Sequence, residues 1–218
     1  MKVKIILASA SKRRSKILKE CGIPHRVAIS RVPEKMDHKR GAGFSVLYNA
    51  RAKAGKIAKG RKEGFVIGAD TVVLMGRRLI GKPKTKKETR RFLKAFSAKT
   101  ILVYTGICVI DAAKKKSVSA VDVSKIHVKK LSRKKIDKFV KIALSHDKAG
   151  GFSIEGPGAF IFDNIEGSFY NILGLPLTKL YGLFGKLGAD LCEIIVPLAN
   201  YSFRRYTVNK LPGPRKEE

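Results

Sequence analysis

Residues 5–18 read Ile-Ile-Leu-Ala-Ser-Ala-Ser-Lys-Arg-Arg-Ser-Lys-Ile-Leu, and this stretch sets the beginning of the fold. The apolar run predicts a strand over residues 3–8. Apolar residues then recur at helical spacing, which predicts a helix over residues 12–21 that stops at Gly22. A strand that leads directly into a helix is typical of α/β proteins.

The turn between this strand and this helix has the composition of a phosphate-binding site. Ser9 and Ser11 can cap or line the helix start, where free backbone N–H groups point toward an incoming anion. Arg13 and Arg14 add guanidinium groups that donate hydrogen bonds in pairs. Taken alone, the stretch fits a capped surface helix with solvated arginines equally well.

The composition is that of a folded, strongly basic protein. Its 218 residues and 44% hydrophobic content suit one α/β domain or two small lobes that share a sheet. The 47 lysines and arginines against 17 acids leave a formal charge of +30, which favours polyanions and nonspecific nucleic-acid binding. Basic residues are dense at 77–99 and 114–148, interleaved with apolar ones, and a solvated basic face explains most of them.

Nothing in the sequence resembles a membrane anchor or an export signal. No apolar run approaches the roughly 20 residues that cross a bilayer, and residues 5–8 are too short for the apolar part of a signal peptide. Cys21, Cys108 and Cys192 are odd in number and widely spaced, which suits neither a disulfide framework nor a zinc site. We therefore expect a cytoplasmic protein with reduced thiols and no membrane partner.

Three polar side chains stand where a ligand would meet the fold. Lys53 lies at the margin of the apolar face of a helix predicted over residues 44–60, so its ammonium can face a cleft. Asp70 follows a predicted buried strand at residues 65–69, and ligands gather at strand ends in open α/β sheets. Lys82 lies between a glycine and a proline in a tight turn and can neutralise a phosphate. The plainer alternatives are a surface lysine at 53 and a turn aspartate at 70.

Two strands and a glycine-rich loop follow. Residues 101–110 and 118–128 predict strands that pair across the intervening turn, the first with a bulge or kink at residues 104–106. Residues 149–158 are rich in glycine and carry Glu155, which suits either a loop that approaches a ligand closely or an ordinary connection.

With these segments placed, the chain resembles the Maf family, also called septum-formation proteins or nucleoside triphosphate pyrophosphatases, over residues 3–188. Any one motif would be weak evidence, but seven in the family's order and spacing make a chance resemblance improbable. The matching segments are 7–11 (LASAS) with Arg13 and Arg14, 50–54 (ARAKA), 68–73 (GADTVV), 81–83 (GKP), 104–106 (YTG), 148–150 (KAG) and 167–176 (GSFYNILGLP).

The resemblance implies a fold and an activity. The expected fold is α/β, an elongated mixed sheet flanked by helices with two lobes around a nucleotide cleft, similar to inosine triphosphate pyrophosphatases. The expected reaction is hydrolysis of a nucleoside triphosphate to the monophosphate and pyrophosphate by metal-assisted water attack at the α-phosphate. The divalent metal cation would be Mg²⁺, with Mn²⁺ or Co²⁺ as substitutes.

The resemblance also implies roles for residues already singled out. Asp70 serves as general base or metal ligand, and Glu34 is the second carboxylate; which of the two holds the metal stays open. Lys82 completes the catalytic group. The residues expected to bind the substrate are Ser9, Arg13, Arg14, Lys53, Thr71 and Glu155.

Two features of the sequence point to different bases. Glu155 stands where the pyrimidine-selective branch of the family commonly has glutamine, and an ionised carboxylate accepts hydrogen bonds but donates none. It is better matched to the N–H donors of guanine, yet Asp70-Thr71 looks like the pyrimidine branch. Glu155 as a structural loop acid paired with one of the many lysines is the alternative.

We expect residues 1–188 to form the Maf-like domain and residues 189–218 a basic C-terminal extension without an assigned role, in a homodimer of the family type. The alternative function is that of a basic nucleic-acid-associated or cell-division regulatory protein without essential catalysis. Asp70 and Glu34 argue against it, because a pure anion binder does not need acids that repel phosphate. A P-loop NTPase is disfavoured because no Gly-x-x-x-x-Gly-Lys-Ser/Thr pattern follows the first strand, and a zinc enzyme is disfavoured because the four histidines lack the paired spacing of zinc ligands.

Overall fold

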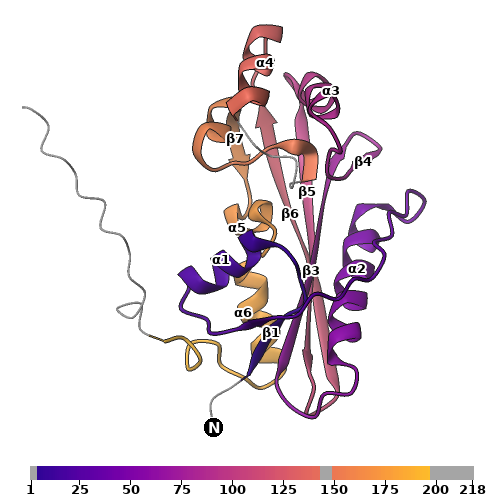
Figure 1. Ribbon diagram of the computed structural model, residues 1–218, viewed down its shortest axis with the longest axis vertical. Coiled ribbons are helices and arrows are strands. Elements are labelled where there is room, and N and C mark those ends of the chain that lie inside the picture. The colour runs from indigo at the N-terminus through magenta and orange to yellow at the C-terminus, as the bar shows by residue number, and fades with distance from the viewer. Residues whose placement is uncertain (1–3, 143–148, 197–218) are drawn as a thin grey trace, which may run out of the picture.

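A computed structural model describes residues 4–142 and 149–196 (Figure 1). Within these residues the chain forms one mixed sheet in the order β2-β1-β3-β5-β6-β7, with β4 paired to β3. Only the β2–β1 and β1–β3 pairs are parallel. The strands are β1 (Ile5–Leu7), β2 (Arg26–Val27), β3 (Phe65–Met75), β4 (Arg78–Ile80), β5 (Thr100–Asp111), β6 (Lys116–Val128) and β7 (Phe162–Glu166).

Helices cover both faces of this sheet, whose long strands β3, β5 and β6 give the molecule its elongated shape (Figure 1). The predicted class, an elongated α/β fold with a mixed sheet flanked by helices, is confirmed. The helices are α1 (Lys12–Glu20), α2 (Gly41–Ala58), α3 (Lys86–Phe96), α4 (Arg133–Ile142), α5 (Phe169–Leu173) and α6 (Leu177–Lys186), with the 3₁₀ turns η1 (Ala149–Gly151) and η2 (Gly156–Ile161).

Successive side chains of a strand point to opposite faces of the sheet, so the hydrophobic core lies partly on one face and partly on the other. On one face, Ile6 and Val66 pack against alanines of α2. On the other face, Leu7 and Ile67 belong to the large cluster that also contains the buried apolar side chains of α1 and α6. Because β1 has only three residues, its carboxyl end and the β1–α1 turn open beside the middle of β3.

The position of Asp70 differs from the prediction. The strand at residues 65–69 does not end before Asp70 but continues to Met75, because residues up to Leu74 pair with β5. Asp70 therefore lies in the middle of a long strand. The strand that ends beside Asp70 is β1, which pairs with β3 in parallel.

The predicted bulge at residues 104–106 is wrong. β5 pairs with β3 and with β6 residue for residue through this segment, and Gly106 stands opposite Asp70. Gly106 is required for another reason, since a Cβ there would lie 2.4 Å from the carbonyl carbon and oxygen of Val46 in α2. The glycine thus lets α2 approach the sheet closely.

Two short strands, β2 and β4, were not predicted. They have two and three residues, which are too few to show the alternation of a strand.

Part of the predicted C-terminal extension is described. Leu191 is buried and the Val196 N–H donates to the Gly22 carbonyl, whereas residues 197–218 lie outside the described residues. The domain boundary at residue 188 stays a prediction. In the described ranges, no helix is both long and apolar enough to cross a membrane.

We expect Gly106→Ala to lower the free energy of unfolding by about 1–3 kcal/mol, because the added methyl group collides with helix backbone. Gly182→Ala is the matched control, since nothing in α6 or around it lies within 4 Å of the position that a Cβ would take there, and alanine favours a helix. Urea unfolding of both variants checks this. Equal stability of the two variants would contradict the close packing of α2.

Candidate active site

A pocket opens beside the middle of β3, between the β1–α1 turn, the segment before α2, the β4–α3 loop and α5. Its volume is about 120 Å³. The polar lining combines cations and carboxylates, whereas the rest is apolar. The polar lining residues are Ser11, Arg13, Arg14, Glu34, Asn49, Asp70, Thr71 and Lys82.

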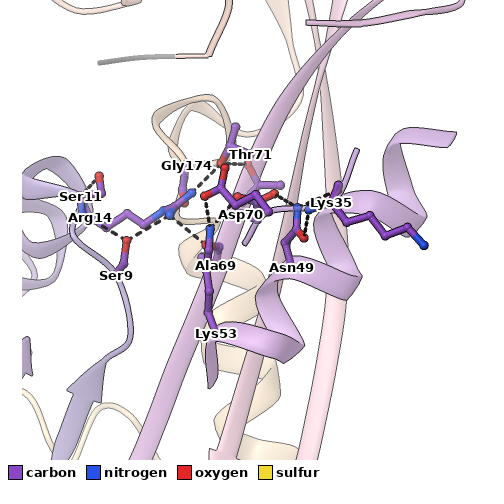
Figure 2. A network of polar contacts seen from close by, with 12 residues as sticks. Ser9, Ser11, Arg14, Lys35, Asn49, Lys53, Ala69, Asp70, Thr71 and Gly174 are labelled. Atoms are coloured by element: carbon purple, nitrogen blue, oxygen red, sulfur yellow. Dashed lines mark hydrogen bonds and ion pairs between the residues drawn. The ribbon is translucent and has the colours of Figure 1, made fainter. Parts of the chain in front are cut away.

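Arg14 is the structural centre of this pocket (Figure 2). Its guanidinium is buried and donates through Nε to the Gly174 carbonyl (2.7 Å) and through Nη1 to the Ala69 carbonyl (2.9 Å) and Ser9 Oγ (3.2 Å). Nη2 donates to Thr71 Oγ1 (2.9 Å). Burial lowers the pKa of Arg14 below its ordinary value, although the charges of the nearby carboxylates oppose this shift. Arg14 therefore joins three segments of the chain as well as adding charge.

The two serines of the turn have separate positions. Ser11 is the N-cap of α1, where its Oγ accepts a hydrogen bond from the Arg14 backbone N–H. Ser9 is buried, and its Oγ accepts from the Ser11 N–H and from the Arg14 side chain. Ser9 thus fixes the turn and the guanidinium together, and its own hydroxyl hydrogen is not used by these bonds.

Two carboxylates converge on the ammonium of Lys53. Lys53 Nζ lies 2.7 Å from Glu34 Oε1 and 2.8 Å from Asp70 Oδ1, and both Lys53 and Asp70 are buried. Glu34 is half exposed on the segment before α2. Burial alone would raise the pKa of Glu34, but the hydrogen bond and charge of Lys53, with the charges of Lys82 and Arg14, lower it below its ordinary value. Glu34 is therefore held as a carboxylate.

Asn49 was missed by the sequence analysis. Its Nδ2 donates to Asp70 Oδ2 (2.8 Å), while its amide pairs with both backbone groups of Lys35 (Figure 2). It thereby connects the segment of Glu34 to the strand of Asp70. The signal was present in the sequence, because Ser45, Asn49 and Lys53 are polar residues four apart on the buried side of α2.

At the rim of the pocket, Arg13 meets Glu155. Arg13 Nε lies 3.3 Å from Glu155 Oε2, and Arg13 Nη2 donates to Ser153 Oγ (3.0 Å). Glu155 precedes η2 and is exposed. The structural alternative paired Glu155 with a lysine, whereas the ion-pair partner in the structure is Arg13. Lys82 lines the pocket with an exposed side chain.

The apolar part of the lining was also missed. Hydrophobic side chains from distant segments meet there, and sequence spacing gives no sign of such a meeting. They are Met36, Val72, Val73, Val103, Phe152, Ile154, Ile172 and Leu173.

The donor set of the pocket fits a hard divalent cation. Among residues 4–142 and 149–196 no three His, Cys, Asp or Glu side chains come together to form a complete metal cage. Mg²⁺, however, is usually held by one or two carboxylates together with substrate phosphates. Asp70 and Glu34 already converge on one cation, the ammonium of Lys53.

The fold and the site define an α/β protein whose cationic pocket contains two fixed carboxylates. The chain belongs to the Maf family, since the family described as Maf-like protein matches residues 4–187. This confirms the predicted family.

Two similar relatives carry the same name. A dTTP/UTP pyrophosphatase of Dictyoglomus thermophilum is 37% identical over 192 residues, which cover 88% of this chain and all of the relative. A dTTP/UTP pyrophosphatase of Desulforamulus reducens is 35% identical, with 86% and 98% covered. These names agree with the predicted enzyme class. A solved structure of a HAM1 protein from Coxiella burnetii aligns with a TM-score of 0.43 at 17% identity, covering 60% of this chain and 75% of that one.

We expect Lys82→Gln to raise the pKa of Glu34, because the ammonium of Lys82 is one of the charges that lower it. A lowered carboxyl pKa stabilises the folded state above the unfolded-state pKa, and this contribution disappears as the pH falls through the folded pKa. The Lys82→Gln variant therefore loses part of this stabilisation of the folded state. A ¹³C NMR titration of the Glu34 carboxyl measures the shift. Lys84→Gln is the control, and the same pKa in both variants would place Lys82 away from Glu34.

Proposed function

We propose that this chain hydrolyses nucleoside triphosphates to the monophosphate and pyrophosphate, with dTTP and UTP as its substrate class. The names of its relatives support this proposal. The structural observation that carries it is a buried carboxylate, Asp70, fixed inside a pocket whose lining also contains the cations Arg13, Arg14 and Lys82. A site that only binds phosphate is weakened by such an acid, whereas hydrolysis needs a group that accepts a proton from water.

The cations of the pocket have different roles in binding a triphosphate. Arg14 donates four hydrogen bonds to protein acceptors, so its charge and its position matter more than direct contact with substrate. Arg13 and Lys82 are more accessible and can contact the phosphates directly. Both can neutralise charge that develops on the leaving pyrophosphate.

In the chemical step, a water oxygen forms a bond to the α-phosphorus while the bond from that phosphorus to the α–β bridging oxygen breaks. Asp70 accepts the proton of the water; each of its oxygens takes one hydrogen bond from the protein, which leaves lone pairs for this role. Asp70 and Glu34 would hold Mg²⁺ or a similar cation, which supplies further neutralisation of phosphate charge when bound. Asn49 and Lys53 keep the Asp70 carboxylate in place.

Glu155 can meet one group of a pyrimidine base. Uracil and thymine present both an N–H donor and carbonyl acceptors, and a carboxylate serves only the donor. The ion pair with Arg13 holds the Glu155 carboxylate in place at the rim of the pocket.

The Asp70→Asn variant tests the activity itself. We expect kcat for pyrophosphate release with Mg²⁺ or Mn²⁺ to fall about 10²–10⁴-fold, because the amide cannot accept the proton. The measurement covers UTP, dTTP, CTP, GTP, 7-methyl-GTP and ITP. Asp163→Asn, an exposed aspartate on β7, is the matched control. Wild-type turnover by Asp70→Asn would remove Asp70 from the mechanism, and silence of the wild type on all six nucleotides would favour the regulatory alternative.

The Glu155→Gln variant tests base selection. Glutamine can both donate and accept, so we expect the ratio of kcat/KM for UTP over GTP to rise about threefold to tenfold, the effect of one added hydrogen bond. Glu20→Gln, at the surface of α1, is the control. An unchanged nucleotide profile would show that Glu155 does not face the base.

A further inference from the structure

The fold brings the two basic stretches of the sequence onto one surface. Helix α3 comes from the first stretch and α4 from the second, and the two helices pack side by side at the same end of the molecule (Figure 1). Together they carry ten lysines and arginines and only two acids, Glu88 and Asp137. Both acids are already engaged, Glu88 with Arg91 and Asp137 with Arg90.

A groove of about 750 Å³ runs between these helices. Its rim carries Lys94, Arg133 and Lys141, which are exposed and form no ion pair with any residue in the described ranges. The apolar part of its lining is Leu131 and Ile136, and the Arg90–Asp137 ion pair completes the lining. The volume lies in the range of sites that take a small ligand or a short segment of a polymer.

The groove is separate from the candidate active site. It shares no lining residue with the pocket around Asp70. α3 ends four residues before Thr100 and α4 begins five residues after Val128, so both lie near the end of the long strands opposite the Phe65–Asp111 pair. A partner can therefore occupy the groove while the pocket stays open.

We propose that the α3–α4 groove binds the phosphodiester backbone of a single-stranded nucleic acid. A basic groove that follows the backbone is the common feature of proteins that bind single strands. A duplex suits this surface less well, because a DNA major groove admits one helix, and here two helices stand side by side. None of the lining residues within 4–142 and 149–196 is aromatic, so these residues offer bases no stacking platform, and we expect binding that is independent of sequence.

The test compares two triple variants of the full chain. Lys94→Gln, Arg133→Gln and Lys141→Gln together remove the unpaired rim charges. Lys56→Gln, Lys59→Gln and Lys62→Gln remove three exposed charges at and just beyond the carboxyl end of α2, at the opposite end of the long strands. Fluorescence polarisation of a labelled 5′-hydroxyl dT20 strand is measured between 50 and 200 mM salt, with circular dichroism to verify folding.

For a single strand, log K falls with log salt by about 0.7 for each neutralised phosphate, so the groove variant should show a slope shallower by about two than the wild type. The control variant should keep a slope near that of the wild type. Equal slopes for the two variants would overturn the proposal, because binding would then depend on the positive charge of the whole surface and not on the groove. Binding of a 20-base-pair duplex, or of anionic vesicles, at least as tight as that of the single strand would also overturn it.

Discussion

The geometry of the site depends on one buried cation, the guanidinium of Arg14. Removing such a charge from water costs several kcal/mol in real proteins, and here the cost is offset by acceptors on Ser9, Ala69, Thr71 and Gly174. The guanidinium is planar and its donors diverge at fixed angles. Satisfying them therefore fixes the β1–α1 turn, the middle of β3 and the segment after α5 relative to one another.

A second constraint places the carboxylates. Helix α2 can approach the sheet closely because Gly68 and Gly106 have no side chains, and Cβ atoms there would meet α2 backbone. This approach brings Asn49 and Lys53 to Asp70. The carboxylate is thus oriented before any substrate arrives, and in a low-dielectric site such preorganised charge is worth more than the same charge in water.

Local patterns predicted the β1–α1 turn, the long helices and the approximate places of Lys53 and Asp70, since each depends on a few neighbouring residues. The place of Asp70 within β3 could not be predicted, because pairing with the distant strand β5, as far as the Leu74–Leu102 pair, decides where β3 ends. The Gly174 carbonyl was equally hidden, since a backbone acceptor has no side-chain signature. Asn49 lies four residues before Lys53, so it could be placed beside Lys53 once the buried face of α2 was known.

The Arg14–Gly174 hydrogen bond joins residues 160 positions apart in the chain. Contacts of such separation form late, because a long loop must close before they can exist. During synthesis from the N-terminus, the sheet through β6 can be complete while the pocket still lacks its last wall. The order of the elements along the chain thus delays the completed pocket until α5 has been made, so an unfinished chain does not yet contain it.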